Sequence, residues 1–358
     1  MGNAKATTST KDVVYQVSAG VSNAILVCLG VGLLLQSISN FVHWQPLSQI
    51  GQIAQILLPA SFGVAIASML KTNTLVIFSS MIASTVGSNG VFFTGDKIDA
   101  VTATGHAATQ AASAGVFTTG QPISAVLAGL AAALIGKYLT GKTPLDMMLV
   151  PFTATLVGSL IGLGLAAVTT PALIWVSHFI AQSMAVNPLV GSVLIALAWA
   201  VFLMTPASSA ALAVAIMLDP VSSAAALIGT TAQFVGFTAM SFKENNLGAN
   251  IAQSVVTPKI QFPNLMLNPR LVIPPFVAAI VCAPIATMLF HFETSYKIAG
   301  LGLNSFIAPI NLASNDLRGF MIYVACGVVL PIIISVVVQK VLVKLKWIEA
   351  GQLNIEVV

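Results

Sequence analysis

The sequence predicts an all-α polytopic membrane protein, and two observations carry this prediction. The chain has 358 residues, of which 57% are hydrophobic and only 7% are charged. A soluble globular domain has about 25% charged residues, so this chain lacks the polar surface that water requires. Its apolar runs are also continuous, whereas the strands of an outer-membrane barrel alternate apolar and polar residues. The composition therefore excludes a cytosolic enzyme, a nucleic-acid-binding protein and a disordered regulator.

Apolar runs long enough to cross a hydrocarbon core of about 30 Å follow one another along the chain. One or two further spans fit the shorter apolar pieces, so we expect about ten transmembrane helices. The clear runs lie near residues 13–38, 47–70, 72–93, 121–140, 147–169, 189–205, 221–240, 271–292 and 318–343.

The lysines predict the orientation, because cytoplasmic loops carry an excess of Lys and Arg. If the N-terminus is cytoplasmic, only Lys97 of the first five spans lies outside, beside Asp96 and Asp99. The C-terminal lysines also lie inside if the later crossings are even in sum, and we expect both termini in the cytoplasm. The lysines expected inside are Lys5, Lys11, Lys71, Lys137, Lys142, Lys340, Lys344 and Lys346.

Three segments do not have the pattern of simple spans. Residues 171–186 mix apolar and polar residues at helical spacing, which indicates a helix lying along the membrane interface. Residues 205–220 are rich in small residues and too short to cross, and residues 243–269 are rich in amides. Irregular backbone at membrane depth occurs only where it is buried in protein or lines a wet cavity. Transporters build their substrate sites from such segments.

The sequence contains no motif for a metal, a nucleotide or another cofactor, so none is expected. It has no zinc-protease motif, no nucleophile elbow and no phosphate-binding glycine-rich loop. The three cysteines and four histidines are each isolated in the sequence, which argues against a metal cluster. The sequence has no Lys- and Arg-rich run with interleaved aromatic residues, so no nucleic-acid partner is expected.

The amide-rich segment supplies most of the candidate site residues. Amides and a carboxylate offer both donors and acceptors, which suits a small polar solute such as a sugar. The alternative is that Lys243 and Glu244 mark an aqueous loop between two spans. Gln233 lies in the middle of a span, where it faces a cavity or bonds a neighbouring helix. His106 has two interpretations: it binds the substrate or a transported proton, or it is a hydrated histidine in a loop. The candidate substrate-binding residues are Gln233, Glu244, Asn245, Asn250, Gln253, Thr257, His106 and Asn304.

Several runs resemble the membrane-embedded enzyme IIC family of the bacterial phosphotransferase system. They are PASSAALAVAI, GTTAQFVGFTAMSFKENNLGANIAQ, TPKIQFPNLMLNPRLVIPP and AGLGLNSFIAPI. The most similar branch is the stand-alone one named after a perfringolysin O regulator-like protein. The resemblance implies a bacterial cytoplasmic membrane protein with the glucose-superfamily-like enzyme IIC architecture and two re-entrant hairpins. It also implies a homodimer in contact with membrane lipid, and separate IIA and IIB phosphocarrier partners.

The resemblance divides the single membrane domain into four parts. Residues 1–170 correspond to scaffold and dimerisation helices, and 171–186 to an interfacial amphipathic connector. Residues 187–318 correspond to the substrate-holding part, and 319–358 to the last span and a cytoplasmic tail.

The chain departs from the family at two chemically important positions. Sugar-phosphorylating members hold a Glu in a G-I-T-E-P motif, and the matching position here is Thr257, followed by Pro258. The family histidine falls near residues 202–204, where this chain has Phe, Leu and Met. No catalytic residue is therefore assigned. We expect first a transporter of a sugar or sugar-like solute by alternating access, second a phosphotransfer component with IIA and IIB partners, and third a membrane sensor or regulator.

Overall fold

The computed structural model describes residues 10–101, 107–110 and 112–355. The chain begins with a long helical rod, in which α1 and α2 are joined by a π-helical turn. A pair of helices follows, and each has a proline in its first turn, Pro46 in α3 and Pro59 in α4. The axes of these two helices are bent by 54° at the break between them. The first helices are α1 (Thr10–Ala24), α2 (Gly32–Val42), α3 (Gln45–Ile56), α4 (Leu58–Met69) and α5 (Thr74–Gly87).

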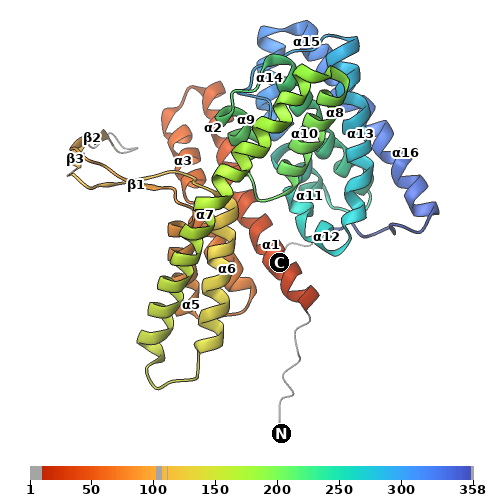
Figure 1. Cartoon of the computed structure of the whole chain (residues 1–358). Coiled ribbons are helices and arrows are strands. Elements are labelled where there is room, and N and C mark those ends of the chain that lie inside the picture. The colour runs from red at the N-terminus through yellow and green to blue at the C-terminus, as the bar shows by residue number, and fades with distance from the viewer. Residues whose placement is uncertain (1–9, 102–106, 111, 356–358) are drawn as a thin grey trace.

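A two-part β arm projects from the helices after α5 (Figure 1). Both strand pairs are antiparallel, and Thr109 Oγ1 donates to Asp99 Oδ1 at 2.8 Å across one of them. The chain between α5 and the next helix is thus partly strand, and β1, β2 and β4 contain the Val, Ile and Phe residues that favour strands. His106, a candidate site residue in this stretch, lies outside the described residues. The strands are β1 (Val91–Phe93), β2 (Ile98–Val101), β3 (Ala107–Gln110) and β4 (Gly115–Phe117).

Helices α5, α6 (Pro122–Leu139) and α7 (Asp146–Val186) pack through small residues. A Cβ on Gly158 would lie 2.7 Å from the Cβ of Ala132 on α6. The Gly158-x-x-x-Gly162 spacing therefore packs helices within one chain.

The long helix α7 joins the two halves of the molecule (Figure 1). It has 41 residues, which makes it about 60 Å long at 1.5 Å per residue. The expected division into a span at 147–169 and a separate connector at 171–186 is therefore absent. The helix continues through Pro171, and transmembrane helices tolerate such prolines where neighbours satisfy the freed carbonyl. The interfacial position of 171–186 stays a prediction.

The second half is a helical bundle around α10. Of the most apolar stretch of α10, 89% is buried inside the protein, compared with 22% for α7. Helix α10 is therefore the central helix. The bundle helices are α8 (Pro188–Met204), α9 (Ser209–Ala215), α10 (Pro220–Ser241), α11 (Leu247–Ile251), α12 (Phe262–Leu267), α13 (Ile273–Pro284), α14 (Ile307–Asn315), α15 (Leu317–Ile322) and α16 (Leu330–Lys344). Short π-helical or 3-10 turns lie at 252–256, 258–261, 269–272, 285–289, 304–306 and 323–329.

Six helices in the described residues are long and apolar enough to cross a membrane, or seven if the bent α3–α4 pair is one span. Every run predicted as a span contains helix, but α5 and α8 are shorter than the other candidates. The expected count of about ten is therefore not confirmed. Large apolar side chains remain exposed along α7, among them Phe152, Leu156 and Trp175, as suits a surface in contact with lipid.

Candidate functional site

Three breaks in the second half of the chain meet at one small cavity. The first separates α8 from α9, the second lies at Thr257, and the third is the turn at residues 300–304. Side chains from the first helical rod close the cavity on its other side. Its volume is about 40 Å³, and it is lined by Leu29, Leu33, Leu203, Ser208, Ser209, Ala210, Thr257, Lys259, Gly300, Leu301 and Asn304.

Local sequence produces each break. Thr205 and Thr257 are extended residues that each precede a proline, and the residue before proline disfavours helical backbone. In the third break and directly after it, Gly302, Ser305 and Phe306 have positive φ, between 50° and 58°. These breaks leave backbone polar groups inside the bundle, where they need partners.

The first and third breaks are bonded to each other. Ser209 Oγ donates to the Gly300 carbonyl at 2.8 Å, and Trp199 Nε1 donates to the Ser209 carbonyl at 3.1 Å. Both Ser209 and Trp199 are buried. The cavity wall is therefore held from two directions by buried hydrogen bonds.

Lys259 reaches from the second break to the first. Its Nζ donates to the carbonyls of Thr205 at 2.5 Å and Ala207 at 2.6 Å, and only 3% of the residue is exposed. Its own carbonyl accepts from Ser22 Oγ at 2.9 Å, which ties this position to α1. Sequence reasoning missed Lys259 as a site residue. A lysine between strongly apolar spans is a signal that would have found it, because buried charges are costly and mark functional positions.

Two predicted site residues, Thr257 and Asn304, line this cavity. The Thr257 hydroxyl accepts from the backbone N–H of Lys259 at 3.3 Å. Asn304 Oδ1 accepts from Ser305 Oγ at 2.8 Å. The cavity thus joins one residue from the amide-rich segment with one from the turn before α14.

Glu244 and Asn245 lie elsewhere, against the C-terminal tail (residues 351–355). The Glu244 carboxylate accepts the N–H groups of Gly351 at 2.9 Å and Leu353 at 3.2 Å. Asn245 donates to the Leu353 carbonyl at 3.0 Å and accepts from the Ile355 N–H at 2.7 Å. Neither residue lines the small cavity. Their role as solute ligands stays a prediction.

Asn250 and Gln253 belong to a buried amide network. Asn250 Nδ2 donates to the Phe242 carbonyl at 2.9 Å, and so caps the end of α10. Gln253 donates to Ser241 Oγ at 2.8 Å and accepts from Gln261 Nε2 at 3.0 Å. These side chains hold the segment to α10, and their role toward solute also stays a prediction.

Gln233 lies between α10 and α13. Its Nε2 donates to the carbonyls of Gly229 and Pro275, both at 3.3 Å. Of the two alternatives for this residue, the structure has the bond to a neighbouring helix. Its Oε1 is buried without a partner.

Residues 243–268 form a hairpin with its base at the tail and its tip at the cavity. Glu244 bonds Gly351 at one end, and Asn268 Nδ2 donates to Gln352 Oε1 at 2.8 Å at the other. Thr257, halfway between them, lines the cavity. We call this segment the 243–268 hairpin; its depth in the membrane stays a prediction.

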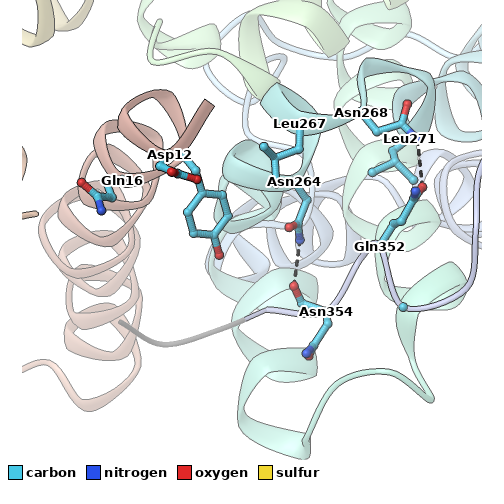
Figure 2. Close-up of a pocket in the computed structure, with 10 residues that line it drawn as sticks. Asp12, Gln16, Asn264, Leu267, Asn268, Leu271, Gln352 and Asn354 are labelled. Carbon is cyan, nitrogen blue, oxygen red and sulfur yellow. Dashed lines mark hydrogen bonds between the residues drawn. The ribbon is translucent and has the colours of Figure 1, made fainter. Parts of the chain in front are cut away.

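A second, larger pocket of about 620 Å³ lies at the base of this hairpin (Figure 2). Asp12 and Gln16 of α1 line it together with Asn264, and Asn264 Nδ2 donates to the Asn354 carbonyl at 2.8 Å. The start of α1 and the C-terminal tail therefore lie at the same end of the molecule.

A cavity where broken helices meet, inside a bundle with several apolar spans, is the arrangement from which membrane transporters build substrate sites. The family model described as "Phosphotransferase system, EIIC" matches residues 15–355. The chain therefore belongs to the enzyme IIC family and is a membrane sugar-transport component. Members of this family work with sugar substrates and with separate IIA and IIB components. The comparisons with curated proteins and with solved structures gave no match. The finer assignment to the perfringolysin O regulator-like branch stays a prediction.

Proposed function

We propose that the protein carries a small polar solute, a sugar or a sugar-like compound, across the membrane by alternating access, with the small cavity as its substrate site. The observation that carries the proposal is the meeting of three chain breaks at one small cavity, beside two residues expected to bind solute. Polar backbone exposed by broken helices is how transporters bind solutes inside a bilayer.

The cavity is too small for a sugar in this conformation. A volume of about 40 Å³ has room for only a few water molecules. We therefore propose that this is an occluded state, and that the 187–318 part moves relative to the 1–170 scaffold to open it. The same proposal includes a homodimer formed through the scaffold and both termini in the cytoplasm.

Counterflow in proteoliposomes, with a panel of labelled sugars and sugar derivatives, tests this function. Thr257→Val keeps the side-chain shape but removes the hydroxyl, and we expect uptake to fall about tenfold, the equivalent of one hydrogen bond. Thr257→Ser keeps the hydroxyl and most of the uptake. Thr238→Val is the matched control, because Thr238 donates only to the Phe234 carbonyl and does not line the cavity. Equal uptake in all four proteins would refute the site.

A second candidate is the phosphotransfer reaction of the family. A sugar hydroxyl then needs a positioned base, and Glu244 would have to replace the family Glu. Both Glu244 oxygens instead accept tail N–H groups, which favours transport. Sugar phosphate formed from phosphorylated IIB protein would reverse this order. Solute binding without flux would favour the sensor.

A further inference from the structure

The cavity wall contains a buried lysine without a carboxylate to match it. Lys259 is the charged residue among those that line the cavity, and it is almost fully buried. Its Nζ donates to two neutral carbonyls. Within the described residues no carboxylate forms an ion pair with it. Burial of an unpaired ammonium is costly. A protonated Lys259 therefore needs a counter-charge that its two carbonyl partners do not supply.

The two carbonyls reduce that cost only in part. Thr205 is the C-cap of α8, and Ala207 follows two residues later, so both carbonyls lie near a helix end whose dipole favours a cation. A dipole supplies roughly half an elementary charge, which is less than an ammonium carries. When Lys259 is protonated, the cavity wall therefore lacks a full counter-charge.

The remaining polar groups at the cavity add hydrogen-bond donors. The Asn304 carbonyl oxygen is taken by Ser305 Oγ, so its Nδ2 is the group left to bind a ligand. The Thr257 hydroxyl already accepts the Lys259 N–H, so its proton is available for donation. A cation and two donors are complementary to a ligand rich in acceptors and negatively charged.

We propose that the solute carries a carboxylate, and that Lys259 binds it; the preferred class is sugar acids rather than neutral sugars. This inference rests on the proposed transport function and names its substrate class. One ammonium balances one carboxylate charge. A phosphate carries more negative charge than that, and the cavity offers no second cation among the described residues.

A comparison of matched solutes tests the substrate class. The full-length protein in proteoliposomes is given glucuronate or glucose, and galacturonate or galactose, at equal concentrations. We expect the wild type to take up the acid of each pair at least tenfold better. Lys259→Met should remove this preference, while Lys259→Arg should retain part of it. Lys243→Met is the matched control, because Lys243 is exposed in the same hairpin.

The outcomes separate this inference from the function on which it rests. Uptake of the neutral sugars with no preference for the acids refutes the carboxylate and leaves transport standing. Unchanged discrimination in folded Lys259→Met shows that Lys259 only caps α8, which also refutes the inference. Uptake of none of the four solutes counts against both. If Lys259→Met does not fold, the wild-type preference between acid and neutral sugar decides.

Discussion

The hydroxyl of Ser209 donates to the carbonyl of Gly300 across 2.8 Å, although the two residues are 91 positions apart in the sequence. Their backbones are also in close contact, since a Cβ on Gly300 would overlap the Ser209 carbonyl group. Glycine is therefore needed at position 300 for steric reasons. This contact brings the first and third breaks together, and the cavity lies between them.

Substitution of Gly300 should separate these two breaks. We expect Gly300→Ala to lower the free energy of unfolding by about 1–3 kcal/mol, the usual cost of overpacking, and to lower transport. Gly248→Ala is the control, because its nearest contact would be an ordinary one at 3.4 Å. Thermal unfolding in detergent measures both. An equal unfolding temperature for both variants would show that the turn at 300–304 yields easily.

The long apolar helices could be predicted closely from the sequence. The run expected at 221–240 is α10, Pro220–Ser241, and the run expected at 121–140 is α6, Pro122–Leu139. Both begin with a proline at the first helical position and a polar cap before it. Hydropathy and capping are local signals, so they need no knowledge of the fold.

The partners of the polar residues could not be predicted in the same way. The sequence indicates that Glu244 and Asn245 need partners, but those partners lie in a tail more than 100 positions away. For Lys259 the sequence is misleading in the other direction. It lies in an amide-rich segment that resembles a loop, yet it is buried and bonds carbonyls of the α8–α9 break. Only the tertiary fold distinguishes a solute ligand from a structural partner.

Removal of the Glu244 carboxylate should release the C-terminal tail. In Glu244→Ala the N–H groups of Gly351 and Leu353 lose their acceptors, and we expect faster amide hydrogen exchange at both positions. Glu349→Ala is the control, because Glu349 is exposed and its carboxylate bonds neither of these amides. Unchanged exchange in Glu244→Ala would mean that the amides alone hold the tail.

The buried amide network should contribute strongly to stability. Gln253 is fully buried and bonds Ser241, Asn250 and Gln261. Gln253→Leu removes the donor to Asn250 Oδ1 and one bond each from Ser241 and Gln261, which keep their bonds to Phe237 and Leu353. We therefore expect a loss of about 1–3 kcal/mol in the free energy of unfolding. Gln52→Leu, at an exposed position, should have little effect. Similar unfolding midpoints for the two variants would indicate that water satisfies the network.

Two glycines on α7 allow a direct test of helix packing, because one is crowded and the other is free. A Cβ on Gly162 would lie 2.5 Å from Gly87 Cα on α5 and 2.6 Å from Ala128 Cβ on α6, whereas a Cβ on Gly164 meets nothing within 4 Å. Both glycines are inside the helix, so Ala brings each the same intrinsic gain of up to about 1 kcal/mol. We expect Gly164→Ala to be neutral or stabilising.

Gly162→Ala should instead lower the unfolding temperature in detergent, because the three helices must move apart to admit the methyl group. The difference between the two variants isolates packing from helix propensity, and size-exclusion chromatography reports the oligomeric state of each. If Gly162→Ala changed the oligomeric state while its unfolding temperature stayed the same, the small-residue face of α7 would serve contact between copies instead of packing within one chain.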